Sequence, residues 1–443
     1  MNKGTLLTIL IILGLVAGAI FGEILYKQDT SSSFIDGFKM WGNLVLVRPL
    51  SLLVIPIVLV SVVVGVTSIG DPSRLGLIGG STILYYLVTM LLAVILGTTL
   101  VATIQPGTGL TEEQSMQLRT QGEMAFQSEE YEEQRERIES AERNETVSSA
   151  WMNILTQLIP TNLFEQMAKN NTLGIIFFSL LLGLALAVGG ERTLPAVRMF
   201  QGLFEGLMII VNWVVWLTPI GVFMLVTYTV GVVGIGNLIG PISMYMLIVL
   251  GGLLAHAFIV LPVILAIFGR ANPYRFMFRM RRALLLAFGT ASSAATLPVT
   301  LDTAENEGGC SKRASNFVLP LGATVNMDGT ALYEAIAVVF LFQLYGIELQ
   351  FGELLIVVIT ATLAAIGAAG IPSAGLVTMV IVIAAVNTSL PRDVPQLPLA
   401  AIGVILGVDR ILDMCRTSVN VWGDSVGARI ISRLAPDESE QAR

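Results

Sequence analysis

The sequence is poor in the residues that most metal proteins and hydrolases use. Its 443 residues include one histidine, His256, and two cysteines, Cys310 and Cys415. Two cysteines cannot build a disulfide framework, and these two lack a metal-ligand spacing. His256 lies inside the apolar run 253–265, where a helix-packing or hydrogen-bonded role is expected. Zinc chemistry and a Ser-His-Asp triad are therefore excluded, and we expect no cofactor and no enzymatic activity.

Charge is also scarce. Only 13% of the residues are charged and 54% are hydrophobic, whereas soluble domains are about a quarter charged. Apolar stretches near the length of a membrane-spanning helix recur along the chain. The first stretch has no small-residue cleavage pattern after it, so we interpret it as a retained span and not a signal peptide. The candidate spans are Leu6–Leu25, Val45–Ser68, Thr82–Ile104, Leu173–Val188, Leu203–Val230, Ile239–Phe268, Phe317–Leu344 and Ala400–Ile431.

The charges that remain are unevenly placed. The stretch 111–146 holds eleven glutamates against four arginines, which predicts a solvated, partly disordered or loosely helical loop. Five arginines lie in the segment 270–282. By the positive-inside rule, both termini are expected in the cytoplasm and the acidic loop, 107–150, outside.

Two apolar segments of the C-terminal half are interrupted in the same way. One is broken by the string SSAATLP at 292–298 and the other by GIPSAG at 370–375, and each is followed by a helix studded with polar residues. Helix breaks at membrane depth survive where protein or a water-filled site covers them, and such pairs indicate a transporter binding site. We therefore expect an all-α polytopic membrane protein with eight transmembrane helices and two re-entrant helical hairpins.

The last helix carries polar residues at spacings of three and four: Asp409, Asp413, Arg416, Asn420 and Asp424. At this spacing they share one face within an arc of roughly 80°. The planar fork of Arg416 can hold a carboxylate, and Asp413 can hold an ammonium group. The set suits glutamate or aspartate. The alternative is an internal Asp413–Arg416 salt bridge that only joins helices.

The hairpin tips and the string NMDGT at 326–330 complete the candidate site. Half-helix N-termini at the tips can bind a substrate carboxylate, and Ser292 and Ser293 can add hydroxyls. Asn326, Asp328 and Asp424 supply hard oxygen ligands that suit a monovalent cation. Sodium is the expected driving ion, and protons remain an alternative. A structural kink is the other interpretation of the 326–330 string.

Glu334 follows Asp328 within the same span. An ionisable carboxylate at membrane depth predicts a proton relay. The alternative is a glutamate that faces a water-filled vestibule.

These motifs resemble those of the glutamate transporter family, the dicarboxylate/amino-acid:cation symporters. The matching strings are 292–298, 326–330, AGIP at 369–372, DMCRT at 413–417 and NVWGD at 420–424, with weaker similarity from Arg48 and Tyr85-Tyr86 onward. The resemblance implies a homotrimeric, elevator-type carrier in the plasma (inner) membrane. Residues 1–268 would hold scaffold and trimer spans 1, 2, 4 and 5, with spans 3 and 6 in the transport domain. Residues 284–431 would form the transport core and 432–443 a cytoplasmic tail.

The resemblance also implies a set of binding residues. Arg416 would bind the side-chain carboxylate of the substrate and Asp413 its amino group. The remaining substrate contacts would be Ser292, Ser293, Thr330, Gly370, Ile371, Pro372, Ser373, Ala374, Gly375, Thr417 and Asn420. Sodium would be bound at three places: by Gly322, Asn326, Asn420 and Asp424; by Thr324, Ala365, Ile366 and Ala368; and by Tyr86, Thr89, Asn326 and Asp328.

The resemblance implies further that Glu334 carries a proton, with potassium counter-transport as a further option. Three positions depart from the family pattern. Met90 replaces a small hydroxyl residue of the third sodium site, and an accessory arginine is absent at Ala291 and Met414.

Other functions remain open. A carrier of neutral amino acids or C4-dicarboxylates would have the same fold, although Arg416 argues against a neutral substrate. A channel is an alternative from another class, and saturable uptake against a gradient would distinguish a carrier from it. An intramembrane enzyme is disfavoured, because Ser292 and Ser293 have no histidine or lysine nearby. The expected partners are the lipid bilayer, a small amino acid and further copies of the chain, with no nucleic acid.

Overall fold

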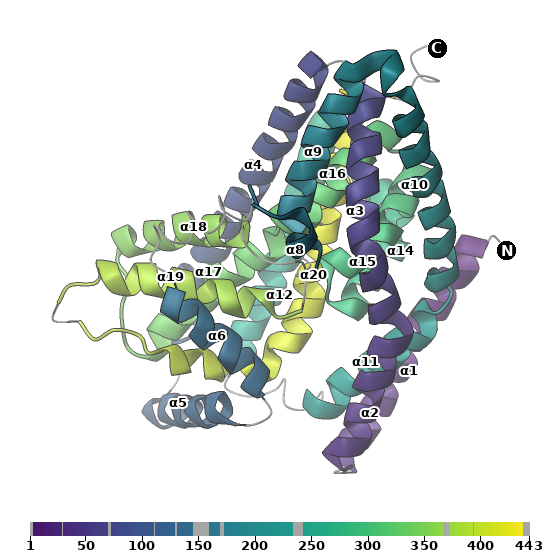
Figure 1. Cartoon of the computed structure of the whole chain (residues 1–443). Coiled ribbons are helices and arrows are strands. Elements are labelled where there is room, and N and C mark those ends of the chain that lie inside the picture. Colours follow the sequence, from purple (N-terminus) through teal and green to yellow (C-terminus); the bar gives the residue numbers. More distant parts are fainter. Residues whose placement is uncertain are drawn as a thin grey trace.

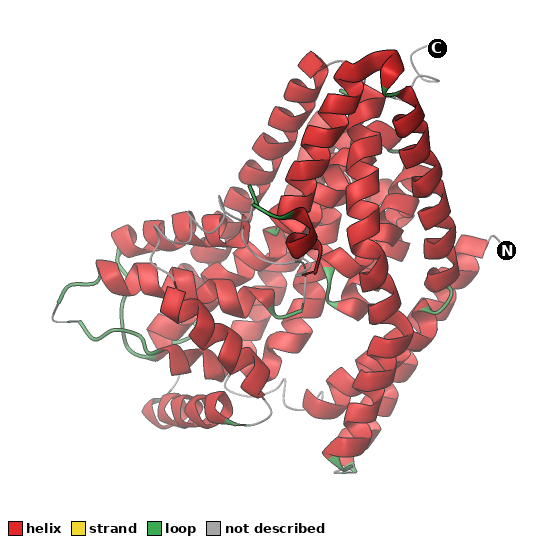
Figure 2. Ribbon diagram, in the orientation of Figure 1, coloured by secondary structure: helices red, strands yellow, loops and turns green. Residues whose placement is uncertain are grey.

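The computed structural model describes residues 3–28, 30–69, 72–109, 111–128, 131–144, 159–168, 172–233, 242–366, 370, 372–392 and 394–436. Within these ranges the chain is built from helices, with no β-strand (Figure 2). Seven helical stretches are long and apolar enough to cross a membrane: Ile9–Lys27, Ser33–Thr67, Gly76–Ile104, Gly174–Arg192, Leu194–Val215, Ser243–Gly269 and Lys312–Leu344. The prediction of an all-α, multi-span protein is confirmed. The count of eight spans stays a prediction.

The first half of the chain forms two packed groups of helices. Its elements are α1 (Lys3–Lys27), α2 (Ser32–Gly42), η1 (Asn43–Val47), α3 (Arg48–Ile69), α4 (Pro72–Ile104), α9 (Thr172–Gly189), η3 (Gly190–Arg192), α10 (Leu194–Val215) and α11 (Thr218–Val233). Figure 1 shows α1 and α2 beside α11 at one edge of the molecule, with α3, α9 and α10 above them. These helices flank the second half of the chain, which carries the polar motifs.

One predicted span is wrong. The sequence suggests a single helix over Leu203–Val230, but α10 ends at Val215 and α11 begins at Thr218. Pro219 lies in the first turn of α11, where a backbone N–H would have no partner within the helix, so its absence removes no hydrogen bond. Inside a continuous helix, the same proline would remove a backbone hydrogen bond. The apolar run 203–230 therefore contains a boundary between two helices that its hydrophobicity does not indicate.

Glycines at every fourth position bring α1 into close contact with α11. These glycines are Gly14, Gly18 and Gly22. A β-carbon on Gly18 would lie 2.7 Å from the carbonyl oxygen of Phe223, and one on Gly22 would lie 2.7 Å from that of Thr227. Small residues at this spacing let two helices approach within membranes, where packing drives association.

The acidic stretch is more ordered than predicted. It forms α5 (Glu112–Gln127) and α6 (Glu132–Asn144), followed by the short α8 (Leu163–Ala168). Thr111 and Gln114 make a capping box at the start of α5. Three residues of α5 at four-residue spacing, Leu118, Gly122 and Phe126, are buried. The expected partial disorder is therefore wrong for the described part of this stretch, whereas its helical character and largely exposed surface agree with the prediction.

The second half begins with a helix broken by π-turns: α12 (Ser243–Ala255), η5 (His256–Val260), α13 (Leu261–Ile264) and η6 (Leu265–Gly269). The remaining elements are α14 (Pro273–Thr290), α15 (Ser293–Thr303), η7 (Ala304–Gly308), α16 (Lys312–Val325), α17 (Asp328–Leu344), α18 (Phe351–Ile366), α19 (Ala374–Ser389), η8 (Leu399–Ile402) and α20 (Gly403–Ile431). Helix α20 contacts α14, α16 and α17, and α6 lies across α19 (Figure 1). The last helix thus packs against the first interrupted segment and against α16 and α17.

Replacing Gly18 with leucine should separate α1 from α11. The added side chain has no space against the α11 backbone, and overpacking of this kind costs about 1–3 kcal/mol. We expect the melting temperature of the purified protein in detergent to fall by several degrees. Gly37→Leu is the control, because a β-carbon on Gly37 would meet no atom within 4 Å. Equal melting temperatures for the two variants would contradict the close packing.

Candidate functional site

The two interrupted segments meet at their turns. The first turn lies between α14 and α15, and the second lies before α19. Each passes through a non-glycine residue with left-handed backbone, Ala291 at φ 51° and Ser373 at φ 58°. Ser292 Oγ donates a hydrogen bond to the carbonyl of Gly370 over 2.6 Å, and the Ala294 N–H donates to the same carbonyl over 3.1 Å. Strained backbone of this kind persists where the surroundings fix it, often at ligand clamps.

A third break separates α16 from α17 at Asn326 and Met327. Asn420 of α20 provides a hydrogen-bond acceptor for the N–H groups at the start of α17, which have no partner within the helix. Its Oδ1 accepts from the Gly329 N–H over 2.7 Å and from the Thr330 N–H over 3.3 Å. Its Nδ2 donates to Thr330 Oγ1 over 3.1 Å. The break is therefore covered by a specific polar side chain, as backbone at membrane depth requires.

The guanidinium of Arg416 is the centre of the polar face of α20. It is 1% exposed. Nε donates to Asp413 Oδ1 over 2.9 Å and Nη1 donates to Asp409 Oδ1 over 2.8 Å. The group lies 4.2 Å from the ring centre of Tyr333, whose hydroxyl also donates to Asp409 Oδ1 over 2.9 Å. In the part of the chain that the structure describes, Nη2 has no hydrogen-bond partner.

Asp413 joins the last helix to the second hairpin. Its Oδ2 accepts from the Ser373 N–H over 2.8 Å, while Oδ1 accepts from Arg416. The Asp413–Arg416 salt bridge that the sequence leaves as an alternative is thus present. It does not satisfy the guanidinium, because Nη2 is left over. A buried donor without a partner is costly, so this geometry favours a ligand that accepts from Nη2.

A narrow pocket opens among these groups. Its lining residues are Ala291, Ser293, Met327, Thr330, Gly370, Ala374, Gly375, Asp413, Arg416, Thr417 and Asn420. Nine of the predicted substrate contacts are among them. Ser292 and Ser373 sit at the neighbouring turns through the hydrogen bonds described above, and the Pro372 carbonyl accepts from Arg137 of α6 over 3.5 Å. Ile371 lies outside the described residues.

The predicted cation ligands gather one turn beyond the pocket. Asn326 Nδ2 donates to Asp424 Oδ1 over 2.9 Å, and Thr89 Oγ1 lies 3.3 Å from Asn326 Oδ1. A β-carbon on Gly322 would lie 2.7 Å from both the Asp424 carboxyl carbon and the Tyr86 hydroxyl. Helices α4, α16 and α20 thus bring oxygen atoms from three parts of the chain together.

The structure describes three of the four residues of the second predicted sodium site. Thr324 Oγ1 donates to the Leu321 carbonyl over 3.1 Å. Ala365 and Ile366 form the end of α18, which contacts α16. Ala368 lies outside the described residues, so the second predicted sodium site stays a prediction. Among the residues described, no cluster of three or more His, Cys, Asp or Glu side chains forms a metal site.

Glu334 is fully buried on α17. Thr378 of α19 donates a hydrogen bond to its Oε1, and Oε2 has no partner among the described residues. The side chain is therefore not solvated, which disfavours the vestibule alternative. It connects α17, which lines the pocket through Thr330, to α19, the helix after the second interrupted segment's turn (α18 and α19 are called hairpin 2 below).

The buried charges of the site do not balance. Five carboxylates, those of Asp328, Glu334, Asp409, Asp413 and Asp424, are each at most 3% exposed. Arg416 pairs with Asp409 and Asp413, whereas Asp328, Glu334 and Asp424 make no salt bridge to a lysine or arginine among the described residues. Isolated carboxylates in a low-dielectric interior are very costly. This excess of negative charge can be relieved by bound cations or by protons.

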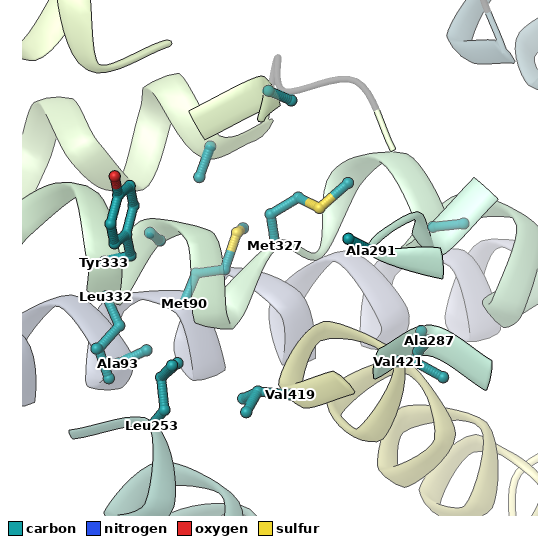
Figure 3. Close-up of a cluster of buried hydrophobic side chains, with 14 of the residues drawn as sticks. Met90, Ala93, Leu253, Ala287, Ala291, Met327, Leu332, Tyr333, Val419 and Val421 are labelled. Carbon is teal, nitrogen blue, oxygen red and sulfur yellow. The ribbon is translucent and has the colours of Figure 1, made fainter. Parts of the chain in front are cut away.

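The three residues that depart from the expected family pattern are apolar and buried. Met90 is fully buried on α4, and Figure 3 shows it among apolar side chains that include Met327 and Leu332. Ala291 lines the pocket and Met414 is 3% exposed. Apolar side chains thus occupy the positions where a hydroxyl or a second arginine would stand.

Sequence reasoning gave no role to several residues of the site. The sequence puts Asp409 on the polar face of the last helix, and its spacing of seven residues from Arg416, two helical turns, puts the two side chains on the same side. Tyr333 and Thr378 carry no signal in the sequence, because their partners lie on other helices. His256 was expected to pack or to form a hydrogen bond, and its Nε2 lies 3.1 Å from Asp328 Oδ2.

Comparison with known families identifies the protein family to which this chain belongs. Residues 7–434 match the model of the sodium:dicarboxylate symporter family. The chain belongs to this family. The resemblance seen in the sequence is confirmed, and the chain is a multi-pass membrane transporter and not an enzyme.

Three relatives illustrate the range of the sodium:dicarboxylate symporter family. Human excitatory amino acid transporter 3 is 37% identical, with 97% of this chain and 86% of the relative covered. A proton/sodium-glutamate symport protein of Geobacillus stearothermophilus is 32% identical, with 97% and 95% covered. The rabbit neutral amino acid transporter B(0) is 33% identical, with 99% and 82% covered. Sodium-coupled symport is thus supported at the level of the family.

Replacing Tyr333 with phenylalanine tests how Arg416 is held. The variant keeps the ring against the guanidinium but loses the hydrogen bond to Asp409, which is worth roughly 1 kcal/mol. We expect affinity for the substrate to fall about threefold to tenfold, with the sodium requirement unchanged. Tyr345→Phe is the control, because the Tyr345 hydroxyl has no partner in the described part of the chain. Unchanged affinity in Tyr333→Phe would contradict this positioning role.

Proposed function

We propose that the chain is a sodium-coupled symporter of acidic amino acids, glutamate or aspartate, with proton co-transport. The observation that carries the substrate class is the unsatisfied Nη2 of Arg416 beside the pocket. An acidic side chain can accept from it, and the guanidinium fork is suited to carboxylates. A neutral side chain would leave this donor without a charged partner.

Recognition of the rest of the substrate follows from the pocket lining. Asp413 supplies a carboxylate for the amino group. The α-carboxylate would lie near Asn420, Thr417 and the start of α15, where helix N-termini favour anions. Hairpin 2 would close the site, because its Ser373 N–H already binds Asp413.

Cation coupling follows from the charge imbalance. The site holds more buried carboxylates than cations, and an acidic amino acid adds further negative charge. Sodium at Asp424, Asn326 and Asp328 would offset that charge with hard oxygen ligands. We propose that Glu334 carries the proton, since it is buried beside the pocket helix with one oxygen unpaired.

We also propose the assembly and orientation that the family resemblance implies. The chain would form a homotrimer of elevator-type carriers in the plasma (inner) membrane, with both termini cytoplasmic. Only 11% of the residues in the apolar window of α10 are buried within one copy. An apolar face of this length must be covered by lipid or by another copy.

Uptake into proteoliposomes tests the proposal. Labelled glutamate, aspartate and serine are supplied under separately imposed sodium, proton and potassium gradients. We expect saturable accumulation of the two acidic amino acids driven by the sodium gradient and increased by an inward proton gradient. Sodium-driven uptake of serine alone would favour a neutral carrier, and flux that never exceeds equilibrium would favour a channel. A potassium gradient of the opposite direction reports on counter-transport.

Arg416→Cys should abolish uptake of acidic amino acids while it spares or creates transport of small neutral ones. Removing one partner of a buried charge pair costs about 2–5 kcal/mol, so we expect at least about a 30-fold loss of affinity for glutamate and aspartate. Arg429→Gln on the same helix is the control, because Arg429 is only partly buried and binds the Gly309 carbonyl at the end of α20. Near-normal glutamate affinity in Arg416→Cys would refute the carboxylate assignment.

Glu334→Gln should make net uptake nearly independent of pH between about pH 5.5 and about pH 8.5, while exchange of internal for external substrate continues. Glutamine resembles the protonated carboxyl group but cannot release a proton. Uptake and exchange are measured on both proteins across this range. Glu353→Gln, at the exposed start of α18, is the control. If the variant keeps the parent's pH profile, Glu334 is not the proton carrier.

A further inference from the structure

His256 is placed against the candidate cation site. It is the first residue of η5, a π-turn inside the helical stretch Ser243–Gly269. Both His256 and Asp328 are fully buried, and the imidazole Nε2 lies 3.1 Å from Asp328 Oδ2. Such π-turns inside helices are frequent at functional sites.

The direction of this hydrogen bond follows from the chemistry of the two groups. An ionised carboxylate only accepts, so Nε2 carries the hydrogen that lies between the two groups. In the described part of the chain, neither His256 Nδ1 nor Asp328 Oδ1 has a hydrogen-bond partner. The imidazole therefore satisfies one carboxylate oxygen and leaves the other available. A buried carboxylate oxygen without a partner is costly unless a cation or donor reaches it.

The last helix fixes this pair from the other side. Trp422 Nε1 donates to the Ala257 carbonyl of the π-turn over 3.0 Å, which anchors the backbone next to His256. A β-carbon on Gly423 would lie 2.7 Å from Asp328 Oδ2 and 3.0 Å from Asn326 Nδ2. Helix α20 thus fixes the π-turn that carries His256 through Trp422. The absence of a side chain at Gly423 leaves room for the Asp328 carboxylate.

We propose that His256 is a positioning residue for sodium binding. It holds Asp328 through Oδ2, so that Oδ1 is the oxygen offered to the cation near Asn326 and Thr89. A hydrogen bond from outside the ligand shell sets the orientation of a ligating carboxylate, and its loss weakens binding. The proposal rests on the proposed function and assigns to it a residue that does not touch the substrate.

Sodium-dependent thermal stabilisation tests the proposal without transport. Detergent-purified, substrate-free protein is heated in increasing sodium chloride, with choline chloride holding the ionic strength constant. The variants are His256→Gln, whose amide nitrogen can replace Nε2, His256→Asn, whose shorter amide cannot reach Asp328, and His256→Leu. We expect the sodium concentration for half-maximal stabilisation to rise about tenfold in the Asn and Leu variants and less than about threefold in the Gln variant.

The outcomes separate positioning from packing. In an Asp328→Asn background, His256→Leu should cause no further increase in the sodium requirement. If His256→Leu lowers the melting temperature but keeps the parent's sodium requirement, the residue only packs and the proposal is overturned. If His256→Leu does not fold, equal sodium requirements for the Gln and Asn variants overturn it. A parent protein that sodium does not stabilise contradicts sodium coupling itself, whereas a stabilised parent with unaffected variants contradicts only the role of His256.

Discussion

The buried guanidinium of Arg416 is the group around which the polar side chains in the second half of this chain are arranged. A lone cation at membrane depth is expensive, and Arg416 is tolerated because Asp409 and Asp413 flank it on the same helix face. These two contacts and the ring of Tyr333 fix its orientation and leave one donor over. Hairpin 2 is attached to the same network through the Ser373 N–H. The turn at Ser373 and the pocket beside Arg416 are therefore joined to one charge cluster.

The coupling of substrate to cations that we propose would follow from the same electrostatics. The site holds more carboxylates than buried cations before any substrate enters, and an acidic amino acid increases the imbalance. Substrate and cation then favour each other's binding, and thermodynamic linkage makes the effect reciprocal. Asn420 connects the two regions physically, because it caps α17 beside the pocket and stands one turn before Asp424. Asn420 would therefore link the substrate pocket directly to the proposed cation site, without a chain of intermediate residues.

What the sequence could predict depends on how local the signal is. The polar face over 409–424 follows a helical period, and the strings at 292–298 and 370–375 interrupt apolar runs, so the sequence predicts both features. The first break lies slightly earlier than that string, at Ala291 and Ser292, because α15 already begins at Ser293. The packed helices within 111–144 were missed, because their buried residues are few and are surrounded by glutamates. The contact of His256 with Asp328 joins residues 72 positions apart, and no local pattern reports such a pair. Family resemblance supplied binding roles that composition could not.

The central claim is that Arg416 anchors an acidic side chain in a site that cations complete. Isothermal titration calorimetry on detergent-purified protein tests it most directly, with glutamate and aspartate compared with glutamine and asparagine, each in sodium chloride and in choline chloride. The account predicts binding of the acids in sodium, at least about 100-fold weaker binding of the amides, and no measurable binding of the acids in choline. Equal affinity for acids and amides, or binding of the acids that is indifferent to sodium, would contradict it.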